Sequence, residues 1–225
     1  MDSKANTVER VIAQHRALRV PTEVSCIGHR FWAIPGVFSP LIAPSGFLEL
    51  SFAAWPVFEG RSVLDVGSGS GISTCLFALA GARKVMGADI NPAAAEAGAR
   101  NAKEAGVMDR VGFVIGDVLE PVGSPDEFDI VFANLPFMSG EPRDMLERAF
   151  YDPGLGAIRR FIAGAGAILR RSPSTKVYLC TSNLDAHDLP AHAGRHGLRW
   201  EEALTIDRGW VRMALVELLV GGTGG

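Results

Sequence analysis

The sequence predicts an α/β fold in which seven strands form a mostly parallel sheet, with helices on both faces and an antiparallel edge strand. Short apolar runs alternate with helical stretches from residue 61 onward, which is the pattern of a parallel sheet. A glycine-rich GSGSG stretch follows the first run, where a strand turns into a helix. The chain has 225 residues, 48% of them hydrophobic, so it can bury a complete core without disulfides or metal ions.

Residues 1–58 precede the alternating pattern, and we expect them to form an N-terminal lid or substrate-binding segment. A helix is predicted over residues 7–19, where apolar residues recur at helical spacing. Residues 20–40 should form short extended pieces, because prolines and glycines interrupt them. Residues 41–58 are apolar and aromatic and are expected to contain a helix ending near Pro56.

Residues 59–221 are predicted to form the sheet domain, followed by a flexible tail over residues 222–225. Asn91 and Pro92 mark one helix start, as an N-cap and a first helical residue. The last two strands flank a turn at Asp207, which predicts a hairpin. The expected strands are 61–66, 84–89, 110–115, 128–133, 176–181, 198–206 and 210–220; the helices follow GSGSG to about residue 80 and cover 92–105, 155–171 and 185–195.

The composition excludes several classes of protein. The net charge of −3 argues against a broadly basic domain, and we therefore do not expect nucleic acid as a partner. No apolar stretch is long enough to span a membrane, and the charged N-terminus is not a secretory signal. Three distant cysteines without a CxxC motif argue against a zinc site and favour a reducing compartment. We expect a cytoplasmic protein with no metal centre; its oligomeric state is not indicated.

Acidic residues follow three consecutive predicted strands beside the glycine-rich stretch. Asp65 precedes the first glycine by two residues, Asp89 ends the second strand, and Asp117 follows the third. Ligands of open α/β sheets bind at the carboxyl ends of the strands, and an acid at the second strand can accept hydrogen bonds from ribose hydroxyls. Together these residues describe an adenosine pocket.

The acid before the first glycine selects among adenosine cofactors. A pyrophosphate would be repelled by Asp65, whereas a ligand carrying an ammonium group would be attracted. This favours S-adenosylmethionine (SAM), which has an α-amine, a sulfonium and no phosphate. A nicotinamide enzyme is the weakest option for the same reason.

Residues 61–137 resemble the core of the class I SAM-dependent methyltransferases, through VLDVGSGSG, GADINP, VIGDV and FDIVFANLPF. The strongest likeness is to HemK-like enzymes, which methylate glutamine N5 and other amino groups. The resemblance implies a Rossmann-like fold with SAM as cofactor. It also implies a cofactor site made of Asp65, Gly67, Ser68, Gly69, Gly71, Asp89, Ile90, Asp117, Val118 and Asn134.

The motif Asn134-Leu135-Pro136-Phe137 lies where the resembled enzymes orient their acceptor. An asparagine oxygen and a backbone carbonyl can accept the two N–H groups of a planar nitrogen, and an aromatic ring can stack on it. Leu135 replaces the usual proline, as in rRNA adenine dimethyltransferases. We expect these four residues and Tyr151 to contact the acceptor.

Aromatic residues ahead of the sheet are candidates for closing the site, because a sulfonium is attracted to aromatic faces. Phe31, Trp32 and Phe38 are the predicted lid residues, with Phe47 and Trp55 as further candidates.

Three functions remain open at this point. The first is an N-methyltransferase acting on an amide or amino nitrogen of a protein side chain, a base or a small molecule. The second is a methyltransferase-like SAM cyclase, which would give azetidine-2-carboxylate and methylthioadenosine. The third is a binding subunit that has lost turnover.

Overall fold

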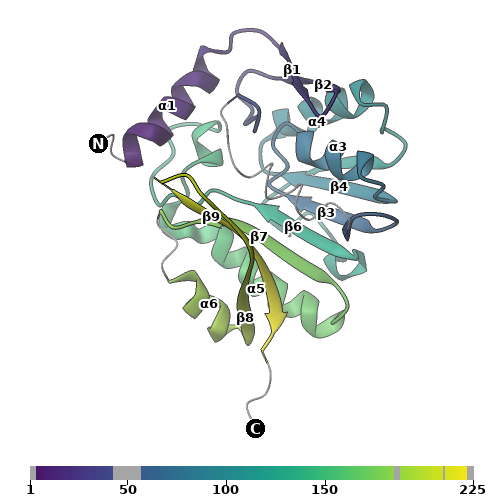
Figure 1. The fold of residues 1–225 in the computed structure, drawn as a ribbon, viewed down its shortest axis with the longest axis vertical. Coiled ribbons are helices and arrows are strands. Elements are labelled where there is room, and N and C mark those ends of the chain that lie inside the picture. Colours follow the sequence, from purple (N-terminus) through teal and green to yellow (C-terminus); the bar gives the residue numbers. More distant parts are fainter. Residues whose placement is uncertain (1–3, 43–56, 185–187, 210, 222–225) are drawn as a thin grey trace.

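The main sheet has seven strands in the order β5-β4-β3-β6-β7-β9-β8 (Figure 1). The computed structural model describes residues 4–42, 57–184, 188–209 and 211–221. The strands are β3 (Ser62–Val66), β4 (Lys84–Asp89), β5 (Val111–Ile115), β6 (Ile130–Asn134), β7 (Lys176–Ser182), β8 (Leu198–Asp207) and β9 (Arg212–Val220). The strands from β5 to β7 are parallel, and β9 runs antiparallel to both β7 and β8. The predicted α/β fold is confirmed, with the antiparallel strand lying one place in from the edge.

Helices cover both faces of this sheet. They are α3 (Ile72–Leu79) and α4 (Pro92–Glu104), which pack together, and α5 (Gly156–Arg171) and α6 (Leu189–Arg195), which form a second pair. Alternate residues of β3 enter two cores: Val63 packs with α3 on one face, and Leu64 packs with α5 on the other. This alternation follows from the two-residue period of a strand. All five residues of β3 are buried, as expected for the centre of a parallel sheet.

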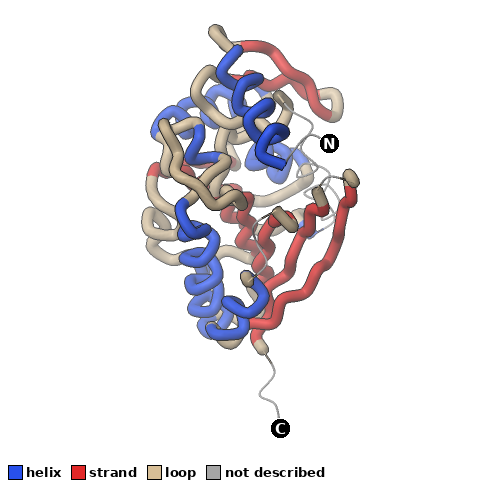
Figure 2. Tube along the Cα trace, turned by 90° about the vertical axis from the view of Figure 1, so that its left-hand side faces the viewer, coloured by secondary structure: helices blue, strands red, loops and turns tan. Residues whose placement is uncertain are grey.

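The N-terminal part forms α1 (Lys4–Ala17) and a hairpin of β1 (Thr22–Cys26) and β2 (His29–Ala33). Figures 1 and 2 place these elements at one end of the molecule, with the end of β9 at the other. Val8 and Ile12 of α1 join the core that contains α3. Phe47 and Trp55 lie outside the described residues, as does the tail 222–225. Most of residues 41–58, where a helix is predicted, also lie outside them.

Asn101 of α4 fixes the hairpin against the glycine-rich loop. Its amide oxygen accepts a hydrogen bond from the Trp32 backbone N–H at 2.6 Å, and its Nδ2 donates to Trp32 O at 3.0 Å and to Ser70 O at 2.8 Å. The side chain is fully buried. One buried amide thus connects three segments that are far apart in the sequence.

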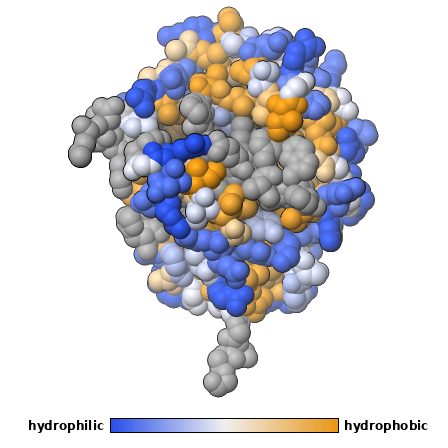
Figure 3. Space-filling view, viewed as in Figure 1, coloured by the Kyte–Doolittle hydropathy of each residue, from blue (hydrophilic) through white to orange (hydrophobic). Residues whose placement is uncertain are grey.

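The surface in Figure 3 mixes hydrophilic and hydrophobic residues, with hydrophilic residues along much of the rim of this face. Two arginines of α5 are paired with acids: Arg159 with Asp188, and Arg171 with Asp126. None of the helices within the described ranges is both long and apolar enough to cross a membrane.

Glycines permit α3, α4 and β5 to meet at the ring of Phe113. A Cβ added at Gly98, in the middle of α4, would lie 2.4 Å from Phe113 Cε1, whereas one added at Gly194 of α6 would have no atom within 4 Å. The two glycines therefore offer a matched comparison between a crowded and an open helical position.

Gly98→Ala should lower the free energy of unfolding by about 1–3 kcal/mol, because the added methyl group overpacks the contact with Phe113. The control Gly194→Ala should raise it by roughly 0.5–1 kcal/mol, because alanine is the better helix former. Urea unfolding of both variants measures this. Equal effects of the two substitutions would show that Phe113 does not crowd Gly98.

Candidate active site

A cavity of about 760 Å³ opens at the carboxyl ends of β3, β4, β5 and β6. Its walls come from the loop after β3, from the ends of the next strands, from α1 and from the tip of the β8–β9 hairpin. Its volume is typical of a site for a cofactor or small molecule, and its place is where open α/β sheets bind ligands.

The loop after β3 is shaped by glycines at positive φ. Gly67 has φ 78° and Gly69 has φ 52°, a region that side chains disfavour, and both residues line the cavity. A Cβ on Gly67 would lie 2.7 Å from the carbonyl oxygen of Asn134, so this position also excludes side chains by contact. Ser68 is buried and Gly71 caps α3; neither of these two predicted cofactor residues faces the cavity.

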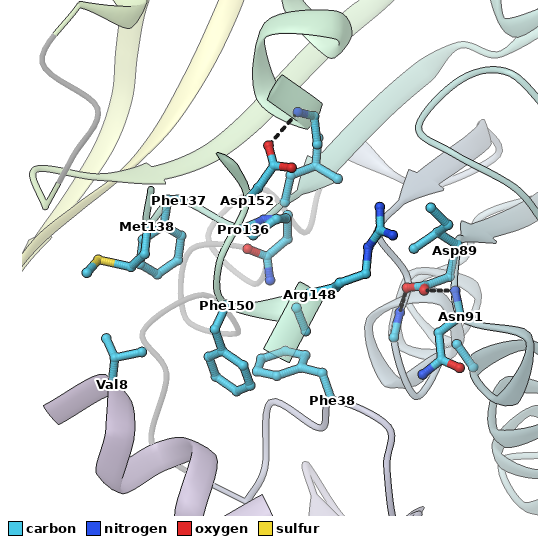
Figure 4. Close-up of a pocket in the computed structure, with 18 of the residues that line it drawn as sticks. Val8, Phe38, Asp89, Asn91, Pro136, Phe137, Met138, Arg148, Phe150 and Asp152 are labelled. Carbon is cyan, nitrogen blue, oxygen red and sulfur yellow. Dashed lines mark hydrogen bonds between the residues drawn. The ribbon is translucent and has the colours of Figure 1, made fainter. Parts of the chain in front are cut away.

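Asp89 holds the loop from the neighbouring strand (Figure 4). Its Oδ2 accepts a hydrogen bond from Gly69 N at 2.8 Å, and its Oδ1 accepts one from Asn91 N at 2.9 Å. Burial raises the pKa of this carboxyl above its ordinary value, and the two N–H groups oppose that rise. Each oxygen retains a lone pair that can accept a further hydrogen bond. Asp89 and the adjacent Ile90, two of the predicted cofactor residues, both line the cavity.

Asp117 and Val118 line the same side of the cavity. Both oxygens of Asp117 accept from Arg160 Nη2, at 3.1 and 2.9 Å. Val118 has φ 51°, an uncommon conformation for a β-branched residue, and is nine-tenths buried. Arg160 also lines the cavity, and the sequence did not single it out.

Asp65 lies beneath the loop rather than on the wall of the cavity. It is 1% exposed, and one of its oxygens accepts a hydrogen bond from Thr74 Oγ1 at 2.6 Å. Burial is the main cause that raises the pKa of Asp65 to about 7. We expected Asp65 to lie beside a ligand amine, but its carboxylate is buried beneath the loop instead.

The four residues of the predicted acceptor motif, Asn134 to Phe137, all line the cavity. Asn134 is the last residue of β6, and within the described parts of the chain its side chain has no hydrogen-bond partner. Its amide is thus available to a bound group.

Tyr151 is not on the wall, whereas its neighbours Phe150 and Asp152 are. Its hydroxyl donates to Glu9 Oε1 of α1 at 3.1 Å. In the same region Glu147, 1% exposed, accepts from Arg143 Nη2 at 2.6 Å and from Arg16 of α1 at 2.5 Å. The hydrogen bonds from Arg143 are the main cause that lowers the pKa of Glu147 to about 2. This cluster fastens α1 to the segment after β6.

Phe38 alone of the three predicted lid residues reaches the cavity. Its ring stacks on His15 with centroids 5.4 Å apart and meets Phe150 edge-on at 5.5 Å. Phe31 is fully buried in the core, and Trp32 lies under Arg100, whose guanidinium carbon is 4.2 Å from the ring centroid. The structure therefore places Phe31 and Trp32 away from the site, because the hairpin packs on α4.

Several wall residues come from segments that the sequence motifs do not include. Val8 and Val11 of α1 carry only an amphipathic pattern as a signal, and nothing in the sequence places the hairpin tip here. These additional residues include Val8, Arg10, Val11, Met138, Arg148, Leu184, Arg208, Val211 and Met213.

The part of the chain that contains the glycine loop and the Asn134 motif matches a known protein family. Residues 63–151 match the family profile described as "Methyltransferase domain". This match includes the glycine-rich loop, all three acidic residues and the Asn134 motif.

Curated relatives match part of the chain. The ribosomal protein L11 methyltransferase of Syntrophotalea carbinolica is 42% identical over 75 residues, covering 33% of this chain and 24% of the relative. That of Acinetobacter baumannii is 30% identical over 137 residues, covering 52% and 46%. The ribosomal protein arginine N-methyltransferase rmt3 of Schizosaccharomyces pombe is 30% identical over 152 residues, covering 66% and 26%. The chain spans less than half the length of these relatives.

Solved structures share the fold at low identity. The ribosomal protein L11 methylase of Lactobacillus delbrueckii subsp. bulgaricus superposes with a TM-score of 0.60 at 17% identity, covering 80% of both chains. The Thermus thermophilus 16S rRNA N2 G1207 methyltransferase, solved with AdoMet and guanosine, gives 0.62 at 20%, covering 88% of this chain and 50% of that one. The tRNA m1G37 methyltransferase of M. jannaschii gives 0.59 at 16%, covering 91% and 58%.

These comparisons correct the prediction about partners. A small-molecule acceptor and the exclusion of nucleic acid are both contradicted, because the similar proteins are named as methyltransferases of ribosomal proteins, rRNA and tRNA. The net charge of −3 averages over the whole surface and does not describe the surface around one cavity.

The raised pKa of Asp65 predicts how the free energy of unfolding changes with pH. Between the ordinary value of 3.8 and the folded value of about 7, the folded chain binds a proton that the unfolded chain releases. The free energy of unfolding contributed by Asp65 therefore falls as pH rises through this range, and the penalty is complete above it. Asp65→Asn removes this ionisation.

Asp65→Asn should gain stability relative to the parent chain as pH is raised from 5 to 8, by roughly 1 kcal/mol or more, the worth of one pKa unit. Urea unfolding of both proteins at several pH values measures the difference. The change with pH is the readout, because a fixed cost of burying an amide shifts both ends equally. Parallel pH profiles would show that Asp65 titrates normally in the fold.

Proposed function

We propose that this chain is a SAM-dependent methyltransferase of class I, with residues 63–151 as its methyltransferase domain, and that it transfers a methyl group to an amino nitrogen of a protein. The observation that carries the proposal is the Asn134 side chain, which has no hydrogen-bond partner among the described residues and faces the cavity that the glycine loop also lines. Because both motifs line one cavity, a cofactor and an acceptor bound there would lie close together, which suits transfer of a methyl group between them.

The residues that line the cavity suit SAM. Gly67 and Gly69 leave room for its methionine part, and Asp89 has lone pairs for the ribose hydroxyls. Asp117 and Val118 would flank the adenine. Asp65 lies beneath the loop and would not touch the ligand. SAM supplies an electrophilic methyl group attached to a positively charged sulfur.

Asn134 would orient the attacking nitrogen. Its amide oxygen and a backbone carbonyl of the motif accept the two N–H groups, which directs the nitrogen lone pair at the methyl carbon. The bond from methyl to sulfur breaks as the bond to nitrogen forms, and S-adenosylhomocysteine leaves. The methylated nitrogen then loses its extra proton to solvent, so the transfer itself requires no side-chain base.

The far end of the cavity favours an amine on an aliphatic chain. Val8, Met138, Leu184, Val211 and Met213 line it, and each is at least nine-tenths buried. An apolar wall disfavours a charged ammonium, so it lowers the pKa of an entering amine and increases the neutral form that can attack. The methylene stem of a lysine side chain would pack against the same residues.

A protein acceptor is also supported by the curated relatives, which are named for ribosomal proteins. RNA is the competing acceptor class, since rRNA and tRNA methyltransferases share the fold. The glutamine acceptor of HemK-like enzymes stays a prediction, and the SAM cyclase alternative has no support among these relatives. Residues of α1 form part of the cavity wall, which supports a lid or substrate-binding role for residues 1–58.

The acceptor class can be tested with SAM carrying a labelled methyl group. The chain is incubated separately with ribosomal proteins, with ribosomal RNA and with no acceptor. Label in protein, located by mass spectrometry on a nitrogen, is the expected result. Label only in RNA would replace the protein proposal, and methylthioadenosine formed without acceptor would replace methyl transfer.

Asp89→Asn should weaken SAM binding by about 1.5–3 kcal/mol, the worth of hydrogen bonds to a charged acceptor. Calorimetric titration measures the affinity, and the thermal unfolding midpoint shows whether the loop has kept its structure. Unchanged affinity in a folded variant would remove Asp89 from the ribose site.

Asn134→Ala should reduce kcat by roughly 100-fold or more with a SAM affinity close to that of the parent chain, because positioning of the nitrogen is lost. Single-turnover rates with the labelled acceptor and calorimetry with SAM separate the two effects. A loss of SAM binding equal to the loss of rate would instead make Asn134 a cofactor residue.

A further inference from the structure

Arg148 extends from a short 3-10 helix, η3 (Glu147–Ala149), into the cavity (Figure 4). In this view its guanidinium points toward the half that contains Asp89 and Asn91 rather than toward Phe137 and Met138. The backbone that carries it is anchored, since Arg148 N donates to Asp144 O at 3.3 Å and the adjacent Glu147 is buried.

The two acids that precede Arg148 most closely, Asp144 and Glu147, form ion pairs with other arginines. Glu147 is bound by Arg143 and Arg16, and Asp144 by Arg16 at 2.7 Å. Arg148 has no ion pair or side-chain hydrogen bond within the described ranges of the chain. It therefore turns away from an acidic cluster beside it and presents its donors to the cavity.

The other charged groups on the described wall already have partners. Arg160 binds Asp117, and Arg10 and Arg208 each interact with another residue. Asp89 accepts two backbone N–H groups, and Asp152 accepts Ala157 N at 2.7 Å. An anion that enters the cavity therefore meets the donors of Arg148 without having to displace a carboxylate.

We propose that Arg148 binds the α-carboxylate of SAM. A guanidinium can hold a carboxylate through two parallel hydrogen bonds, which fixes its orientation as well as its charge. The cofactor half is favoured over the acceptor end because the side chain points toward Asp89. This inference rests on the proposed function, since it requires a SAM site in this cavity.

The test compares two ligands that differ in the amino-acid part. S-adenosylhomocysteine has the carboxylate, whereas methylthioadenosine has the same nucleoside and thioether without it. Arg148→Ala should raise the Kd of S-adenosylhomocysteine roughly 10- to 100-fold, as expected for a charge-assisted hydrogen bond, and leave the Kd of methylthioadenosine unchanged. Arg148→Lys should lie between the two, because it keeps the charge without the two-pronged geometry.

Arg171→Ala is the matched control, because this arginine pairs with Asp126 and is not on the cavity wall. It should change neither affinity. An equal change for both ligands in Arg148→Ala, or no change for either, would overturn the carboxylate assignment. A raised KM for the acceptor with unchanged affinity for S-adenosylhomocysteine would place Arg148 in acceptor binding. Failure of the parent chain to bind either ligand would overturn the proposed SAM site itself.

Discussion

The contact between Gly67 and the carbonyl oxygen of Asn134 determines how the site is assembled. β3 and β6 are parallel neighbours, with Val66 beside Ala133, so the segments that leave them begin at the same level of the sheet. Any side chain at Gly67 would collide with that carbonyl, since even a Cβ would lie 2.7 Å away. A glycine here therefore allows the loop of one strand and the Asn134 motif of the next to share one cavity.

Two further contacts hold this arrangement from outside the pair of strands. Asp89 accepts Gly69 N from the side of β4, and the carbonyl of Phe38 accepts Ser70 N at 3.0 Å from the N-terminal segment. Phe38 in turn stacks on His15, which is buried. Val11 O lies 2.9 Å from Nδ1 of His15 and can only accept, so Nδ1 carries a proton, whereas Nε2 lies 3.1 Å from both the N and the O of Ser39. Burial lowers the pKa of His15, which favours the neutral ring, in which Nε2 accepts Ser39 N.

The sequence predicted the parts of the molecule that depend on neighbours along the chain. The strands, the cap at Asn91 and the placement of Asp89, Asp117 and Asn134 at strand ends follow from local pattern and sheet topology. Phe31 and Trp32 were misplaced because their position depends on a hairpin packing against Asn101, 69 residues away from Trp32. The cavity wall formed by α1 and the hairpin tip was missed for the same reason: these segments reach the cavity only through tertiary packing. Net charge misled the partner prediction because recognition depends on local charge.

Much of the proposed acceptor end lies outside the region shared with known methyltransferases. The matched residues 63–151 contain the glycine loop and all three acids. Val8 and Val11 on one side of the acceptor end, and Val211 and Met213 on the other, lie outside that match. α1 is also fastened to the segment after β6 through Glu147 and Tyr151, so the wall and the motif form one packed unit. Similarity over the shared region therefore supports the proposed cofactor site, whereas the proposed acceptor depends on how α1 and β9 pack beside it.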